Sequence, residues 1–181
     1  MKKNVWIAIA LVVAVFSLSS CGTQQSATQP TSKPVTTDTV VSVEPIKDVI
    51  SIAEALEMFQ NPDKTAAITK KYGYKLKTNY EVYRLDKFTK MYYKNCALAK
   101  LLTADKYEDY PKPMRKGVSS YIAFKDGAMI IAVFNQPAYD NLVAQVKAAG
   151  FTLDMPGNED IYKKGNRTIA CYKDGKSVRI E

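Results

Sequence analysis

Hydrophobic and polar positions divide the chain into three stretches. Residues 5–18 are an apolar run with no charged residue, residues 23–44 are rich in Gln, Ser, Thr, Pro and Val, and the mixed pattern of a globular domain follows. The apolar run is too short for a stable transmembrane helix, which takes about 20 residues. The middle stretch cannot bury enough apolar surface to offset its ordering entropy. We therefore expect a single folded domain over residues 49–181, preceded by a flexible tether.

Helical patterns begin at several points of this domain. Ser51 with Glu54 is a capping-box pattern for a helix over residues 52–59. Pro62 and Pro137 suit the first turn of two further helices, because a missing N–H costs nothing there.

Both of these later helices are expected to end at a glycine that an aromatic residue follows. Gly73 and Gly150 suit the left-handed position just past a helix end. Before Gly150, Leu142, Val146 and Ala149 lie on one helix face. This face is expected to pack on a sheet.

Strand patterns occupy much of the remaining chain. Residues 121–134 predict a hairpin that turns at Lys125-Asp126-Gly127. Residues 168–180 predict a second hairpin that turns at Lys173-Asp174-Gly175. Asp-Gly between β-rich runs favours a type I′ turn in both. Residues 128–134 are nearly all apolar, which is typical of a central strand.

An internal repeat connects these elements. The matches pair residues 59–62 with 134–137, 71–76 with 148–153, 82–84 with 161–163, and 93–95 with 172–174. Because the four matches occur in the same order, they indicate two copies of a unit in which a helix is followed by strands. The alternative is that the similarity is convergent, since helices that start at Pro and end at Gly before a strand are common. The expected boundaries are residues 51–97 and 134–181 for the copies, with an insertion at 98–117 and a hairpin at 118–134. Residues 82–102 alone come close to helical spacing, but the repeat predicts two strands as far as residue 95 or 96.

These patterns predict an α+β domain, in which helices cover one face of an antiparallel sheet built from two tandem repeats. Helices followed by antiparallel strands resemble the domains of β-lactamase inhibitory protein and of small envelope-assembly lipoproteins. The resemblance concerns architecture and compartment only, and it implies no particular activity.

The apolar run has the flanks of an export signal. Lys2 and Lys3 precede it, and it ends in Leu-Ser-Ser-Cys-Gly at residues 18–22. This ending resembles the lipobox of bacterial lipoproteins. The resemblance implies that residues 1–20 are removed and that Cys21 carries a diacylglycerol, with residues 21–48 as the lipidated cysteine and tether. An ordinary secretory signal with an incidental cysteine is the alternative.

The residues after Cys21 bear on where such a lipoprotein would be sorted. Residue 22 is Gly, not the Asp that in many proteobacterial lipoproteins marks retention at the inner membrane, so the resemblance implies the outer membrane. Residues 22–26 lack the acidic residues that surface-exported lipoproteins carry there, which favours a periplasm-facing domain.

Charge and rare residues narrow the chemistry. The formal net charge is +8, and the chain has no His. Ser-His and Cys-His catalysis and His metal ligation are thereby excluded. A basic excess suits acidic partners such as lipopolysaccharide or phospholipid head groups, with simple solubility as the alternative. Nucleic acid is not an expected partner, because export separates the protein from it.

Two cysteines remain after Cys21. In an oxidising periplasm Cys96 and Cys171 could pair, and closing a loop of about 75 residues would contribute about 3 to 4 kcal/mol. Both lie in apolar-rich stretches, where a buried free cysteine behaves as a small hydrophobic residue. The sequence leaves both alternatives open.

Candidate chemistry is sparse. The carboxylate clusters are Asp105, Glu108 and Asp109, and Glu159 and Asp160. Both lie beside Gly, Pro or Tyr, which favours solvated surface over a catalytic pair. The chain has no Gly-rich phosphate loop and no nucleophile elbow.

Tyrosine is abundant and interleaved with lysine, notably at residues 72, 74, 80, 83, 92, 93, 107 and 110. These residues suit either a recognition surface or half-buried sheet faces. Tyr107 and Tyr110 are expected contact residues, because they lie in the insertion. We therefore expect an envelope lipoprotein with a non-catalytic domain that binds protein, cell-wall material or glycan without metal or cofactor. The alternative is a hydrolase that acts on cell-wall or dietary polymer through carboxylates.

Overall fold

The computed structural model describes residues 42–82, 86–98 and 111–181, apart from the side chains of residues 82 and 86. The helices are α1 (Ile52–Gln60), the 3-10 helix η1 (Pro62–Lys64), α2 (Thr65–Lys71) and α3 (Gln136–Ala148). The strands are β1 (Lys75–Val82), β2 (Asp86–Lys94), β3 (Cys96–Ala97), β4 (Lys112–Pro113), β5 (Ser120–Lys125), β6 (Ala128–Val133), β7 (Thr152–Met155), β8 (Glu159–Lys164), β9 (Arg167–Tyr172) and β10 (Ser177–Ile180). None of the described helices is long and apolar enough to cross a membrane.

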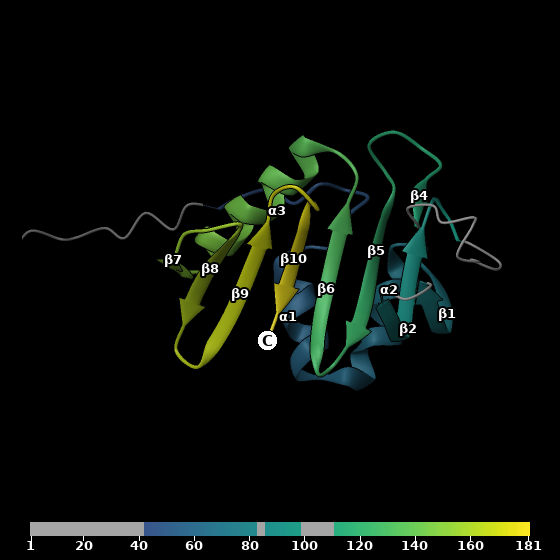
Figure 1. The fold of residues 1–181 in the computed structure, drawn as a ribbon, viewed down its shortest axis with the longest axis horizontal. Helices are drawn as coiled ribbons and strands as arrows, with labels where there is room; N and C mark the ends of the chain where they lie inside the picture. The colour runs from purple at the N-terminus through teal and green to yellow at the C-terminus, as the bar shows by residue number, and fades with distance from the viewer. Residues whose placement is uncertain (1–41, 83–85, 99–110) are drawn as a thin grey trace, which may run out of the picture. The chain divides into compact units, whose positions relative to one another are not determined.

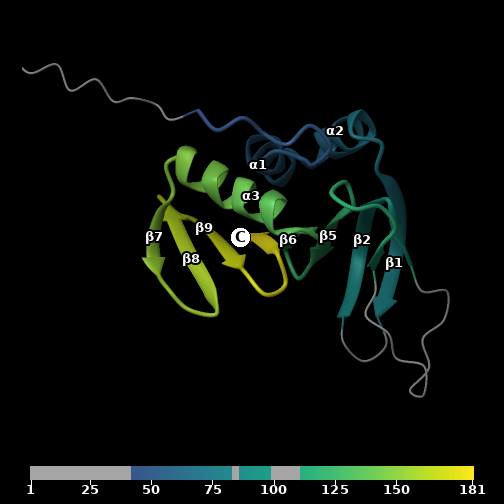
Figure 2. The ribbon, with the colours of Figure 1, turned by 90° about the horizontal axis from the view of Figure 1, so that it is seen from above.

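The domain is α+β, as the sequence predicts. Its main sheet has eight antiparallel strands in the order β1-β2-β5-β6-β10-β9-β8-β7, and β3 and β4 form a separate pair. The helices α1, α2 and α3 lie on the same face of the main sheet (Figure 2). The other face of the sheet carries no helix among the described residues.

Two helices begin with side-chain caps, of which the sequence indicates the one at Ser51. At the start of α1, Ser51 Oγ accepts a hydrogen bond from Glu54 N at 3.2 Å. At the start of α3, Asn135 Oδ1 accepts one from Ala138 N at 2.9 Å. Each cap satisfies an N–H group that the helix itself leaves without a partner.

The two helices that lead into strands end in the same way. Gly73 after α2 and Gly150 after α3 have positive φ angles of 76° and 84°. In each case the next residue, Tyr74 or Phe151, donates its N–H to the carbonyl five residues earlier and is buried. Both ends are Schellman motifs, which direct an aromatic side chain into the core as the strand begins.

One of the two expected hairpin turns has the predicted form. Between β5 and β6, Asp126 and Gly127 both have positive φ, as a type I′ turn requires. Between β9 and β10 the loop is longer, and Lys176 has the positive φ instead of Gly175. An added Cβ at Gly175 would lie 2.5 Å from the Tyr172 ring, so this glycine allows a close approach of the ring.

The register of the central strands gives the sheet an approximate two-fold symmetry. The pairing of β6 with β10 matches Ala132 with Ser177, Ile131 with Val178, Ile130 with Arg179 and Met129 with Ile180. A two-fold rotation between two antiparallel strands exchanges them, and the strand order extends this symmetry over the whole sheet. The strands β1-β2-β5-β6 then correspond to β7-β8-β9-β10.

This symmetry corrects the expected repeat boundaries. The hairpin β5–β6 corresponds to β9–β10, so it belongs to the first copy rather than between the copies. The match of residues 82–84 with 161–163 is wrong, because Val82 ends β1 whereas residues 161–163 lie in β8, the counterpart of β2; residues 83 and 84 lie outside the described residues. The match of residues 93–95 with 172–174 is wrong as well, because Tyr93 is in β2 whereas Tyr172 is in β9. The sequence match failed because a long connection separates β2 from β5, whereas β8 and β9 are joined by a tight turn. Strand rather than helix before residue 96 is confirmed by β2, but the expectation of two strands there is wrong, because β1 ends at Val82 and β2 alone spans residues 86–94.

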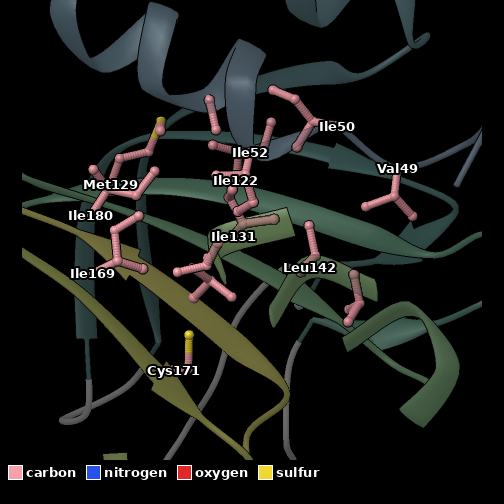
Figure 3. Close-up of a cluster of buried hydrophobic side chains, with 14 of the residues drawn as sticks. Val49, Ile50, Ile52, Ile122, Met129, Ile131, Leu142, Ile169, Cys171 and Ile180 are labelled. Carbon is pink, nitrogen blue, oxygen red and sulfur yellow. The ribbon is translucent and has the colours of Figure 1, made fainter. Parts of the chain in front are cut away.

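The main core lies between the helical layer and the sheet. Figure 3 shows Ile50, Ile52 and Leu142 from the helix side facing Ile122, Ile131 and other residues of the sheet. Leu142 and Val146 are 1% and 0% exposed and Ala149 packs against the cluster, so the predicted face of α3 is confirmed.

The folded part of the chain begins earlier than residue 49. Glu44 O accepts a hydrogen bond from Asn141 Nδ2 at 3.0 Å, and Ile46 packs against the core. Lys94 Nζ binds Asp48 at 2.9 Å. The expected end of the tether at residue 48 is therefore wrong, and the tether ends at about residue 44. The sequence did not show this, because residues 44–48 have no periodic pattern and are held only by contacts with distant elements.

Candidate ligand pocket

Several residues singled out from the sequence lie outside the described residues. These are Cys21, Tyr107, Tyr110 and the carboxylates Asp105, Glu108 and Asp109. Lipidation at Cys21 and ligand contact through Tyr107 and Tyr110 therefore stay predictions.

The two remaining cysteines are buried and free. The Cys96 thiol lies 3.5 Å from Ser120 O of β5, whereas Cys171 is in β9, three strands away. At about 4.8 Å per strand this separation is on the order of 14 Å, beyond the roughly 7 Å that a disulfide spans between Cα atoms. The fold therefore excludes the disulfide alternative. Burial raises the pKa of Cys96 to about 11 and that of Cys171 to about 12.

The carboxylates Glu159 and Asp160 do not converge on one site. They are successive residues of β8, so their side chains point to opposite faces of the sheet. Glu159 accepts two hydrogen bonds from the Arg179 guanidinium, at 3.2 and 2.8 Å, and Asp160 Oδ1 accepts one from Gly157 N at 3.3 Å. The arrangement is that of a surface ion pair and a turn contact.

The described tyrosines do not form the exposed recognition surface that the sequence allowed. Tyr74, Tyr80 and Tyr92 are buried, with 8%, 3% and 8% of their surface exposed. The hydroxyl of Tyr74 lies 2.7 Å from Ser120 Oγ, so its polar end has a partner inside the core. Tyr72 and Tyr93 are half-buried. The alternative of tyrosines on sheet faces therefore holds for Tyr80, Tyr92 and Tyr93, whereas Tyr72 and Tyr74 lie at the end of α2 and just before β1.

A titratable cluster joins the start of α1 to the end of α2. Glu54 accepts hydrogen bonds from Ser51 Oγ at 2.9 Å, from Lys71 Nζ at 2.7 Å and from the Tyr72 hydroxyl. Burial raises the pKa of Glu54, but these bonds outweigh burial and hold it below the ordinary value. Burial and the Glu54 carboxylate raise the pKa of Tyr72 to about 12. Each of these side chains has a hydrogen-bond partner within the cluster. The cluster therefore joins the start of α1 to the end of α2.

Among the described residues, a cavity lies between the helical layer and one end of the sheet. We name it the α1–β5 pocket, and its volume is about 330 Å³. It is lined by Met58 and Phe59 of α1, Pro62 of η1, Thr65 of α2, Thr89 and Lys90 of β2, and Phe124, Lys125, Asp126, Gly127 and Ala128 around the β5–β6 turn. This volume is at the small end of the range for ligand pockets, about 300 to 1,000 Å³.

The apolar wall of the pocket rests on the core. Met58 is 1% exposed, whereas Phe59 and Phe124 pack against the core but are only partly buried. The Phe124 ring meets Tyr92 edge-on at 6.2 Å between centroids, which fixes its orientation. Part of the surface of each phenylalanine ring is therefore accessible to a ligand.

The polar groups gather in the first half of β2 and at the end of β5, which pair antiparallel there. Thr89 Oγ1 donates to Phe124 O at 3.1 Å, so this hydroxyl is already used to join the strands. Lys90 and Lys125 contribute ammonium groups, and Asp126 contributes the single carboxylate of the lining. Behind the wall, the Arg167 guanidinium lies over the Phe59 ring at 5.8 Å. The surroundings of the pocket are therefore positively charged.

The pocket lies where the two copies differ. The second copy has one helix, α3, before its strands, whereas the first has α1 in addition to η1 and α2. Because α1 supplies Met58 and Phe59, the second copy cannot form an equivalent wall. Sequence reasoning missed the pocket, since its residues come from segments about 30 residues apart that no local motif connects.

The lining contains no nucleophile paired with a base, and the described residues contain no group of three or more His, Cys, Asp or Glu that could hold a metal ion. What the pocket offers is apolar contact area with ammonium groups beside it.

In comparisons with known proteins, no family model, curated protein or solved structure matches this chain.

Proposed function

We propose that this chain is a lipid-anchored protein of the bacterial envelope whose folded domain is a non-catalytic binding module, with the α1–β5 pocket as its ligand site. The observation that carries the proposal is the composition of the pocket: an apolar wall of Met58, Phe59 and Phe124 beside lysine ammonium groups. Such a lining binds and orients a small molecule but offers no acid-base pair to transform it.

The proposed anchor is the acylated Cys21, and the proposed location is the outer membrane with the domain facing the periplasm. Residues 22–43 would form the tether, because the first described contact with the domain is at Glu44. A chain of about 22 residues reaches roughly 23 to 28 Å when it is flexible, so the domain would stand clear of the bilayer. Each buried CH₂ of an acyl chain contributes roughly 0.8 kcal/mol to anchoring.

The anchor is tested in growing cells that are fed a labelled fatty acid. The wild-type protein should take up label and sediment with membranes. Cys21→Ser should take up none, whereas Cys96→Ser, which removes a buried thiol far from the signal, should label as the wild type does. Equal labelling of the Cys21→Ser variant would refute the anchor.

The pocket is tested with 1-octanol, a neutral probe with an apolar chain. Binding is followed by amide chemical shifts of the mature chain, residues 21–181, which carries Cys21→Ser so that no acyl chain competes. The largest shifts are expected at Phe59 and at residues 124–128. Ala128→Leu should reduce these shifts, because the larger side chain occupies pocket volume. Shifts spread over the surface, or unchanged by Ala128→Leu, would refute this pocket as a ligand site.

A further inference from the structure

We infer that the ligand of the α1–β5 pocket is an anionic amphiphile, a molecule with an apolar body and a carboxylate or phosphate head. This inference rests on the proposed function, since it names the class of ligand for that site. The apolar body would lie on Met58, Phe59 and Phe124, and the head would lie at Lys90.

The side chain of Lys90 is the reason why we expect the ligand to be an anion. It is exposed at the end of the pocket where β2 pairs with β5, opposite Phe124. No ion pair or hydrogen bond ties its ammonium group to another described residue. An anionic head placed there gains a charge-assisted hydrogen bond without breaking an existing ion pair.

The remaining charges of the pocket also favour a negatively charged ligand. Asp126 is the one acid of the lining, and Lys125 is its neighbour in the chain. With Lys90 counted, the lining carries one more positive than negative charge. The Arg167 guanidinium behind Phe59 adds a further positive charge, and its Nη1 is buried without a hydrogen-bond partner. A cationic head would meet this field unfavourably.

A second groove on the domain differs in that two of its three lysines already have a carboxylate partner. It is lined by Glu44, Pro45, Ile46, Lys47, Asp48, Lys71, Tyr72 and Lys94. There Lys94 is paired with Asp48 at 2.9 Å, and Lys71 with Glu54 at 2.7 Å. An anion that binds at Lys71 or Lys94 would have to displace these carboxylates. The α1–β5 pocket combines an apolar wall with an ammonium group that has no such competitor.

The test compares four probes that share an eight-carbon chain: octanoate, octyl phosphate, 1-octanol and octylammonium. The mature chain carrying Cys21→Ser is titrated with each probe, below its micelle concentration, while the amides of Phe59 and residues 124–128 are followed. We expect both anions to bind about threefold to tenfold more tightly than 1-octanol, and octylammonium to bind most weakly. The difference between octanoate and octyl phosphate distinguishes a fatty acid from a phosphate-bearing lipid as the source of the head group.

Variants of exposed lysines separate the local contact from the general charge of the protein. Lys90→Gln should remove most of the preference for the anions, and Lys90→Glu should reverse the order of octanoate and octylammonium. Lys87→Gln is the matched control, because Lys87 is exposed on the same strand but does not line the pocket. It should keep the preference, and both residues are exposed, so neither change should unfold the domain.

The outcomes distinguish the two proposals. If 1-octanol and the anions bind in the pocket with equal affinity, or if Lys87→Gln acts as strongly as Lys90→Gln, the anionic ligand is refuted while the pocket stands. If none of the four probes moves the pocket amides, the pocket itself is refuted as the ligand site.

Discussion

Ile130 of β6 and Arg179 of β10 lie opposite each other, on the two central strands of the sheet. Ile130 packs against a small apolar cluster that contains Met91 and Ala123. Arg179 instead forms ion pairs with Glu159 and Glu181, at 2.8 and 2.7 Å. The two copies therefore share a backbone arrangement, while the uncovered face of the sheet is apolar in one half and charged in the other.

The buried face of α3 should dominate the stability of the domain. Leu142→Ala and Val146→Ala should lower the free energy of unfolding by about 2 to 4 and about 1 to 3 kcal/mol, because each removes apolar volume from a packed core. Val143→Ala is the control, since Val143 on the same helix is only partly buried and should cost less. Urea unfolding measures all three changes. Similar small losses in all three would contradict the packing of α3 on the sheet.

The left-handed glycine after α2 gives a prediction that does not depend on packing. An added Cβ at Gly73 meets no atom within 4 Å, so its φ of 76° is the main source of strain in Gly73→Ala. We expect a loss of about 1 to 2 kcal/mol, and a smaller loss for Gly73→Asn, because Asn tolerates this conformation. Gly157→Ala is a control at a glycine whose φ is not positive. Equal losses at Gly73 for Ala and Asn would point to a cause other than backbone strain.

The two buried thiols should be unreactive in the folded protein. Burial raises the pKa of Cys96 to about 11 and that of Cys171 to about 12, so little thiolate is present at neutral pH. Iodoacetamide should label both residues quickly in denaturant and slowly without it, as measured by the mass of peptides. A mass that increases by two hydrogens on reduction would instead reveal a disulfide and contradict the strand order.

The Glu54 cluster should make stability depend on pH. The pKa of Glu54 is held below its ordinary value of 4.5, so the folded state releases the proton more readily than the unfolded state. The resulting stabilisation is present above pH 4.5 and is lost as the pH falls through the lowered value. Glu54→Gln should therefore destabilise the domain at neutral pH and have less effect in acid, as followed by urea midpoints at several pH values.

Glu57→Gln is the control for that experiment. Glu57 also binds a lysine, Lys64, but both side chains are largely exposed, at 41% and 57%. An exposed pair of this kind contributes little, about 0 to 1 kcal/mol, so the substitution should change stability only slightly. A pH dependence as large as that of Glu54→Gln would show that general charge, not the cluster, is responsible.

Local sequence determined much of the fold. Ser51 and the glycines at 73 and 150 specify where helices begin and end, because capping and positive φ are properties of a few neighbouring residues. The β-rich run of β5 and the Asp126-Gly127 turn specify a hairpin for the same reason. The α+β class follows from these elements, since helices and strands with one apolar face must cover each other.

Tertiary structure alone decided how the elements are paired and where a ligand site forms. Nothing within β6 indicates that Ile130 faces Arg179, because the register depends on packing across both halves of the sheet. The same holds for Cys96 and Cys171, whose separation is set by strand order. The α1–β5 pocket exists because α1, β2 and the β5–β6 turn meet in space, and such a meeting leaves no periodic signal in the sequence.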